Sequence, residues 1–304
     1  MLRFESPLLA LIATPIIAYC GLSFFFFRKP EILHGKKKSP KFKYMVLAHR
    51  GGAGDRVENT LTAFQYSKEI NCDMLELDVH MTKDGEMVVF HDYTVDRITE
   101  AKGLIKDFDY KDLPKLIPIP EHRNQPFAAD PDSTRIPKLE EVFQAFPDVP
   151  IHLEVKPNNP ELAKKVYDLI QKYNRQDSIL WGCGKGLDML YDLNPNISKF
   201  CSAKIATKII LSYYVGLLPF LSIRETFFNI PSSVTTKWFT LNLLKPKLFE
   251  HLHRRGMKVL VFAPVVGAVN TPEGFKACLD AGVDGMFTDK PVFLRQYLKQ
   301  YNLQ

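Results

Sequence analysis

The segment that decides the fold runs from Leu47 to Asp92 and carries four short motifs. In chain order they are LAHRGG (Leu47–Gly52), ENT (Glu58–Thr60), ELD (Glu76–Asp78) and HD (His91–Asp92). Short apolar runs of the kind found in buried strands accompany three of them, at Met45–Ala48, Met74–Val79 and Met87–Phe90. His49 and His91 directly follow such runs, so the sequence places polar side chains at the ends of neighbouring strands.

Glu76 and Asp78 form a carboxylate pair within one apolar run. Side chains at positions i and i+2 of a strand point to the same face, so the two carboxylates converge. Two carboxylates this close disfavour each other's ionised form, and a divalent cation with oxygen ligands relieves the conflict. The alternative is that one carboxylate caps a turn while the other faces solvent.

A later run, Val149–Lys156, supplies a second set of polar groups. His152, Glu154 and Lys156 share one strand face, so Glu154 is a candidate third oxygen ligand. Lys156, at the end of the run, can hold an anionic oxygen as a point charge. The alternative, an exposed strand face, is weakened by Pro157–Pro160, which marks the opening of a loop.

This ordered set of motifs resembles the glycerophosphodiester phosphodiesterase family over roughly Tyr44–Tyr297. Later matches lie at Ala281–Gly285 and Thr288–Pro291. The chain is most similar to the membrane-anchored, mammalian-type branch with lysophospholipase D activity, through its N-terminus and Leu211–Phe228. The resemblance implies a (β/α)8 barrel, and a substrate hydroxyl that attacks the phosphate to give a cyclic phosphate. Val261–Val265 departs from the family pattern, because the usual Trp and Asn are absent.

Phosphodiester cleavage needs positive charge at the phosphoryl oxygens together with an acid and a base, and the motifs offer such a set. We expect one divalent metal ion, Mg²⁺ or Ca²⁺, at Glu76, Asp78 and Glu154. Arg50 and Lys156 are expected to bind the phosphate, and His49 and His91 to act as base and acid. We expect Asp92 to orient a neighbouring side chain or cap a turn and assign it no chemistry. We interpret Glu58 as a charge at a helix N-terminus.

Composition limits the class of protein. The 304 residues carry a net charge of +6, which is mild and suits an anionic membrane surface better than nucleic acid, for which no motif is visible. The five cysteines are odd in number and scattered, which indicates a reducing compartment and no disulfide framework.

The N-terminus predicts a membrane anchor. Ser6–Phe27 lacks charged residues and is long enough to cross a bilayer. A cleaved signal peptide is the alternative, but the run is not followed by a cleavage site of small residues. Basic residues follow it, so residues 1–43 read as an anchor plus a basic tether. The positive-inside rule places the remainder in the cytosol, and we expect the endoplasmic reticulum or a related endomembrane.

From residue 44 to residue 304, strand-like and helix-like runs alternate, which predicts a (β/α)8 TIM barrel. An open doubly wound sheet is the alternative, but no Gly-x-Gly-x-x-Gly motif follows a strand. We expect a strand at Trp238–Leu241. Ile209–Ile223 is uncharged, and we interpret it as a membrane-associated element beside the barrel mouth, with a core helix as the alternative.

The function that these observations favour is metal-dependent hydrolysis of lysophospholipids to lysophosphatidic acid and a headgroup alcohol. One alternative is hydrolysis of soluble glycerophosphodiesters to glycerol 3-phosphate. An alternative of another class is an inactive, membrane-tethered binding protein, against which the complete pairs His49/His91 and Glu76/Asp78 argue. The expected partners are these substrates and membrane lipids, and the sequence does not define the oligomeric state.

Overall fold

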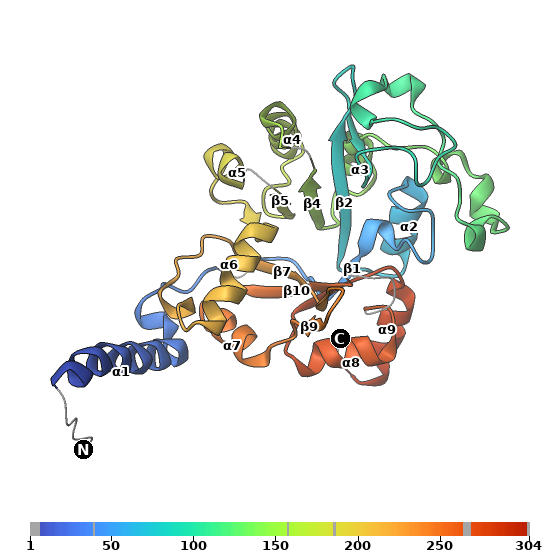
Figure 1. Ribbon diagram of the computed structural model, residues 1–304. Helices are drawn as coiled ribbons and strands as arrows, with labels where there is room; N and C mark the ends of the chain where they lie inside the picture. Colours follow the sequence, from blue (N-terminus) through green and yellow to red (C-terminus); the bar gives the residue numbers. More distant parts are fainter. Residues whose placement is uncertain (1–6, 39, 157, 185–186, 264–268, 303–304) are drawn as a thin grey trace.

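The protein is a nearly closed barrel of parallel strands surrounded by helices (Figure 1). The computed structural model describes residues 7–38, 40–156, 158–184, 187–263 and 269–302. Eight parallel strands follow one another in the order β6-β5-β4-β2-β1-β11-β10-β7, and a bridge between Phe200 and Phe227 links the two edges. They are β1 (Val46–Ala48), β2 (Met74–Met81), β4 (Ile151–Val155), β5 (Ile179–Cys183), β6 (Ser198–Lys199), β7 (Phe227–Pro231), β10 (Lys258–Phe262) and β11 (Gly285–Thr288).

A helix follows each barrel strand before the next one begins, as predicted for a (β/α)8 fold. These helices are α2 (Leu61–Glu69), α3 (Leu139–Ala145), α4 (Pro160–Lys172), α5 (Leu187–Leu193), α6 (Ala203–Tyr214), α7 (Pro246–Arg254), α8 (Pro272–Asp280) and α9 (Pro291–Gln300). The amphipathic pattern of α4 explains its place, because Leu162, Val166, Leu169 and Ile170 are buried against the barrel.

Alternation along the strands separates two apolar layers. The outward-facing residues of β2, such as Leu75 and Leu77, join the large core beneath the helices. Inside the barrel a second cluster contains Leu47, Met74, Leu180, Phe200, Phe227, Leu260 and Phe287. These side chains fill the lower part of the barrel. The inward-facing polar residues Glu76 and Asp78 follow Met74 along β2 and so lie nearer the carboxyl ends of the strands.

Three short strands lie outside the barrel ring and correct two expectations. β3 (Met87–Val89) pairs antiparallel with β2, so His91 follows a hairpin strand and not the carboxyl end of a barrel strand. β8 (Ser233–Thr235) and β9 (Thr240–Asn242) form a separate hairpin. The strand predicted at Trp238–Leu241 is only partly correct, because Thr240 and Leu241 pair with β8 while Trp238 and Phe239 lie in the turn of this hairpin.

The N-terminal helix α1 (Pro7–Arg28) extends from the barrel beside α6 and α7 in Figure 1. Tyr19 and Ser23 donate hydrogen bonds to the carbonyl oxygens of Val215 and Gly216, at 2.5 and 2.6 Å, so polar groups fasten this helix to the barrel. Within the described part of the chain, we find no helix with the length and apolar character needed to cross a membrane. The membrane-spanning helix predicted at Ser6–Phe27 is thus not supported.

The second uncharged segment, Ile209–Ile223, divides into the end of α6 and a 3-10 turn at Leu218–Phe220. Ile209 and Leu218 are fully buried in the core, whereas Leu211 and Leu217 are about half exposed, at 60% and 48%. The segment therefore combines the core helix of the alternative interpretation with an exposed apolar edge.

Candidate active site

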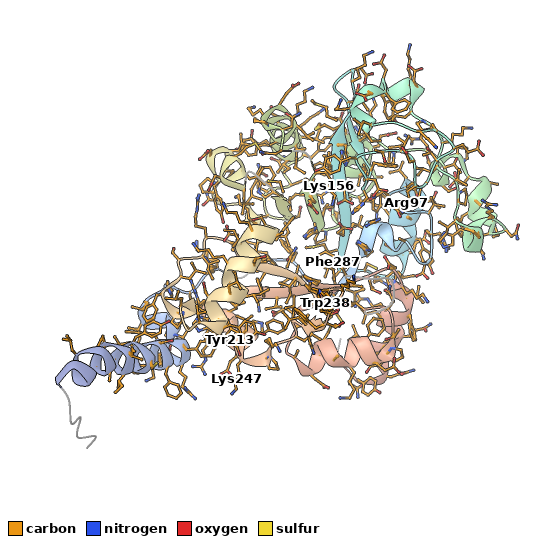
Figure 2. All side chains as sticks on the ribbon, viewed as in Figure 1. Arg97, Lys156, Tyr213, Trp238, Lys247 and Phe287 are labelled. Carbon is orange, nitrogen blue, oxygen red and sulfur yellow. The ribbon has the colours of Figure 1, made fainter. Side chains whose placement is uncertain are left out.

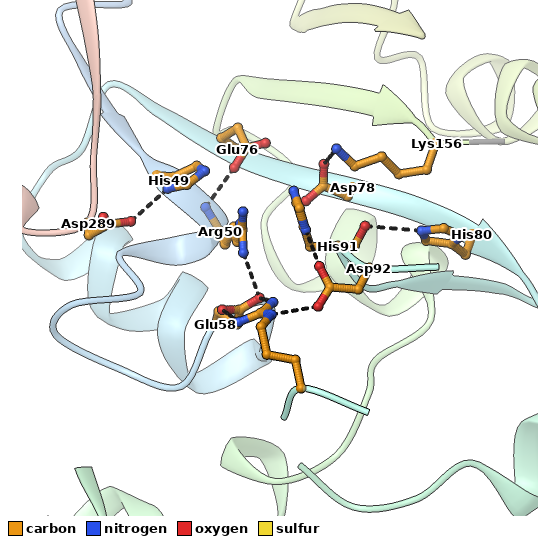
Figure 3. Close-up of polar contacts among 11 residues, drawn as sticks. His49, Arg50, Glu58, Glu76, Asp78, His80, His91, Asp92, Lys156 and Asp289 are labelled. Atoms are coloured by element: carbon orange, nitrogen blue, oxygen red, sulfur yellow. Dashed lines mark hydrogen bonds and ion pairs between the residues drawn. The ribbon is translucent and has the colours of Figure 1, made fainter. Parts of the chain in front are cut away.

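His49 and Arg50 lie in a tight turn directly after β1. Arg50 adopts a left-handed conformation with φ of 51°, an unusual geometry for a residue with a side chain. Gly51 also has a positive φ, and a Cβ there would lie 2.9 Å from Ala63 of α2, so only glycine fits. The backbone N–H of Arg50 donates to Glu76 Oε2 at 2.7 Å, which connects this turn to β2 (Figure 3).

The three predicted metal ligands come from neighbouring strands. Asp78 pairs in register with Glu154, and Glu76 with His152. Burial and the adjacent charge of Asp78 raise the pKa of Glu76 to about 7. Burial also raises the pKa of Glu154. Burial opposes the ionised form of Asp78 too, but the positive charges of Lys156, His91 and Arg50 lower its pKa.

Lys156 lies between two of these carboxylates. Its Nζ is 2.9 Å from Asp78 Oδ1 (Figure 3). The same nitrogen is 3.1 Å from Glu154 Oε2. Oδ2 of Asp78 is buried and has no partner in the described residues. Among those residues, no three His, Cys, Asp or Glu side chains converge closely enough to hold a metal ion. The chemistry of the donor set fits a hard divalent cation, but Lys156 now neutralises part of it.

A charged network holds His91 and Arg50, and the sequence predicted neither of the contacts that Arg97 makes in it. His91 Nδ1 lies 2.5 Å from Asp92 Oδ1, and Arg97 Nε donates to Asp92 Oδ2 at 2.5 Å. Arg97 also forms a fork with Glu58, with distances of 2.6 and 2.9 Å, while Arg50 donates to Glu58 at 3.1 Å. Glu58 is therefore a bridge between two arginines and not a helix N-terminal charge, and Asp92 positions a histidine.

His49 has a similar carboxylate partner from the far end of the chain. Its Nδ1 lies 2.6 Å from Asp289 Oδ1, and Asn270 Nδ2 donates to Asp289 Oδ2 at 2.8 Å. Burial lowers the pKa of His49, but the hydrogen bond with Asp289 and the charge of Glu76 raise it above its usual value. The match at Thr288–Pro291 was the only sequence signal near Asp289, and it gave no role to this residue.

One cavity of about 590 Å³ joins all seven predicted site residues. His49, Arg50, Glu76, Asp78, His91, Glu154 and Lys156 line its polar end. The Nε of Arg50 is buried without a partner in the described residues, so a donor remains free for an anion. An apolar wall also lines the cavity and comprises Phe200, Ala206, Ile210, Ile230, Leu243, Phe262 and Phe287. Phe262 thus forms part of the wall, while Pro264 and Val265 lie outside the described residues.

His152 lines the same cavity but differs from the other two histidines. Burial lowers its pKa to about 3, so it is neutral at physiological pH. Its ring stacks on Phe200 with centroids 4.2 Å apart, and Asn229 Nδ2 contacts its Nε2 at 2.8 Å. These contacts make His152 part of the cavity floor and leave His49 and His91 as the histidines held by carboxylates.

A (β/α)8 barrel that gathers histidines, cations and carboxylates around one cavity has the form of a barrel enzyme, and the comparison with known proteins identifies its class. The model of the glycerophosphoryl diester phosphodiesterase family matches residues 49–292. The chain therefore belongs to this family and is a phosphodiesterase.

Two characterised relatives cover nearly the whole chain. Lysophospholipase D GDPD1 from Homo sapiens is 36% identical over 93% of this chain and 95% of its own length. Lysophospholipase D GDPD3 from Mus musculus is 34% identical over 96% of this chain and 93% of its own length. Among solved structures, a putative glycerophosphodiester phosphodiesterase from Galdieria sulphuraria covers 85% of this chain and 99% of its own, with a TM-score of 0.65 and 20% identity.

Proposed function

We propose that the protein is a lysophospholipase D that hydrolyses lysophosphatidylcholine, lysophosphatidylethanolamine or their N-acyl relatives. The observation that carries this proposal is the apolar wall that continues from the polar end of the cavity. A soluble glycerophosphodiester needs only the polar end, whereas an acyl chain needs a long apolar surface beside it. The similarity to proteins named lysophospholipase D supports the same substrate class.

Helix α6 supplies the part of this wall that faces the acyl chain. Ala203, Ala206, Thr207 and Ile210 line the cavity, and their spacing places them on one helix face. These side chains are small or apolar, so they leave room for a hydrocarbon chain along the helix. Burial of such a chain is favourable in proportion to the apolar area removed from water.

The polar end has the groups that headgroup release requires. We propose that Arg50 and Lys156 hold the phosphate oxygens. The substrate hydroxyl next to the phosphate attacks phosphorus and passes its proton to His49. His91 gives a proton to the headgroup oxygen as its bond to phosphorus breaks, and water then opens the cyclic phosphate.

We further propose that Glu76, Asp78 and Glu154 hold one divalent cation, Mg²⁺ or Ca²⁺. Their hard oxygen donors and the unpartnered Oδ2 of Asp78 support this assignment. A bound cation would supply positive charge to the phosphoryl oxygens. It would compete with Lys156, which now lies within 3.1 Å of Asp78 and Glu154. It would also draw the three carboxylates closer together, since in the described residues they do not yet converge on one point.

The proposed site of action is the cytosolic face of an endomembrane such as the endoplasmic reticulum. The five cysteines are odd in number and scattered, which suits a reducing compartment. The net charge of +6 suits an anionic membrane surface.

Headgroup release from a long-chain lysophosphatidylcholine and from glycerophosphocholine, with one preparation, tests the substrate class. The Ala203→Trp variant should narrow the cavity beside α6. Lys204→Trp is its control, because the neighbouring Lys204 does not line the cavity. We expect Ala203→Trp to lower kcat/KM for the lysophospholipid by about tenfold or more, since apolar pocket contacts are worth roughly 1–3 kcal/mol. Activity on glycerophosphocholine should persist in both variants. Faster turnover of glycerophosphocholine by the unmodified protein would favour the soluble substrate instead.

A further inference from the structure

The hairpin of β8 and β9 ends in a turn that presents two aromatic side chains to solvent. Figure 2 labels Trp238 of this turn. Trp238 is 84% exposed and Phe239 is 60% exposed. Within the described residues the two strands pair only with each other, from Ser233–Asn242 to Thr235–Thr240. Large aromatic side chains are normally buried to a considerable degree, so this exposure calls for a function.

The turn satisfies its own polar backbone groups through Thr236. The backbone N–H of Thr236 and its hydroxyl donate to the carbonyl oxygen of Phe239, at 2.8 and 3.0 Å. The same hydroxyl accepts from the backbone N–H groups of Trp238 and Phe239, at 3.3 and 3.1 Å. Pairing of backbone groups lowers the cost of leaving water, and four backbone groups of this turn are paired in this way.

The charged side chains of the segment that contains the turn are all positive. No Asp or Glu occurs between Glu225 and Glu250, whereas Lys237, Lys245 and Lys247 lie in that interval. The ammonium of Lys237 is 5.5 Å from the ring centroid of Trp238. An aromatic tip with a long cationic neighbour is the combination found where proteins meet lipid headgroups, because the ring sits at the interface and the cation contacts anionic lipids.

The base of the hairpin connects this tip to the active site. Pro231, Val234 and Leu243 line the cavity that contains His49 and Lys156. Leu243 N–H also donates to the Ser232 carbonyl oxygen at 3.0 Å, which holds the base of the hairpin together beside the barrel. The apolar wall of the cavity therefore continues into the hairpin that bears the aromatic tip.

We propose that Trp238 and Phe239 insert into the headgroup region of a bilayer that contains anionic lipids, so that the hairpin places the cavity mouth against the membrane. The purpose assigned to this contact rests on the proposed function, because it delivers a lysophospholipid from the bilayer to the cavity. The contact itself is measurable without turnover.

Tryptophan fluorescence tests the insertion directly, because the chain has only two tryptophans and Trp181 is fully buried. The Trp181→Phe variant leaves Trp238 as the single reporter. With vesicles of phosphatidylcholine and phosphatidylserine, its emission should shift to shorter wavelength and be quenched by brominated acyl chains. If Trp181→Phe fails to fold, loss of the same shift in a Trp238→Phe variant gives the answer. Vesicle binding with no change in Trp238 emission would overturn the proposal.

Substitution of the tip gives a second readout. Trp238→Ala/Phe239→Ala should weaken co-sedimentation with these vesicles by roughly tenfold or more, since interfacial affinity scales with the apolar area buried. Tyr301→Ala is the control, because Tyr301 is also 58% exposed but lies at the end of α9. A dimer that depends on Trp238, with no vesicle binding, would assign the tip to a contact between copies of the chain and overturn the proposal.

Activity separates docking from the proposed function. The double variant should lose turnover of lysophospholipid in vesicles while keeping that of soluble glycerophosphocholine. Equal loss on both substrates would mean that the tip has a structural role, which overturns docking. Vesicle insertion of Trp238 without headgroup release from any lysophospholipid would uphold docking and refute the proposed substrate class.

Discussion

Substitution of Asp289 by Asn is a direct test of how the site controls the proton of His49. The ionised carboxylate only accepts hydrogen bonds, so its 2.6 Å contact keeps a proton on His49 Nδ1 and leaves Nε2 for the substrate. Asn270 Nδ2 donates to the other oxygen of Asp289 at 2.8 Å. In the Asp289→Asn variant, Asn270 Nδ2 would donate to the new amide oxygen at position 289. The amide NH₂ group at position 289 would then face His49 Nδ1. The proton would then move to Nε2, and His49 could not accept one from the substrate.

The expected magnitude follows from the contact that is lost. A hydrogen bond to a charged group is worth roughly 1.5–3 kcal/mol, which corresponds to about a 10- to 150-fold loss in kcat/KM. The substitution keeps the shape of the side chain, so the melting temperature should change little. Headgroup release and thermal unfolding, measured on the same preparation, separate these two effects.

The pH profile gives the sign of the effect. Burial lowers the pKa of His49, whereas the hydrogen bond with Asp289 and the charge of Glu76 raise it. The net effect is a pKa above the usual value. Removal of the Asp289 charge therefore lowers the pKa of His49. We expect the limb of the kcat/KM profile that reports His49 to move to lower pH.

Asp92→Asn is the matched control, because the side chains of Asp289 and Asp92 are 23% and 24% exposed and each contacts one histidine. Asp92→Asn should lower kcat/KM but leave the limb that reports His49 in place. An Asp289→Asn protein with unchanged kcat/KM and an unmoved limb would refute the assignment of Asp289 as the residue that positions His49.

Two further predictions concern the acid–base pair and the cation. His49→Ala and His91→Ala should each lower kcat by about 10²-fold or more, with a double variant little worse than either, and additive small losses would argue against a joint role. Lys156→Met leaves Asp78 and Glu154 without their buried partner, so in cation-free buffer the free energy of unfolding should fall by roughly 3–5 kcal/mol. Mg²⁺ or Ca²⁺ should then raise the melting temperature of Lys156→Met more than that of the unmodified protein, and an equal response would argue against the metal site.

The sequence was sufficient for the barrel and for the residues that line the polar end. Alternation in Met74–Val79 separates core residues from Glu76 and Asp78, and strand register then brings Glu154 beside Asp78. This step works because strand geometry is local and parallel strands end at the same face of a barrel. All seven predicted site residues line one cavity, while their chemical roles and the cation remain proposals.

Residues that act through charge at long sequence separation could not be predicted in the same way. Arg97 lies 39 residues from Glu58, and Asp289 lies 240 residues from His49. Neither pair has a periodic pattern, because contact between distant charged side chains depends on loop geometry and not on alternation. The strand β7 was not predicted either, and its residues Phe227 and Phe228 are fully buried.

Charge balance connects the substrate, the cation and Lys156. When ionised, the carboxylates Glu76, Asp78 and Glu154 outnumber the cations Arg50 and Lys156 by one charge, and a phosphodiester adds one more negative charge. In a site with little water such an excess is costly, because buried charges need partners. A divalent cation would cancel it. It would also free Lys156, now within 3.1 Å of Asp78 and Glu154, to contact the phosphate. We therefore propose that Lys156 offsets part of the carboxylate charge in the absence of substrate, and that substrate and cation would bind together.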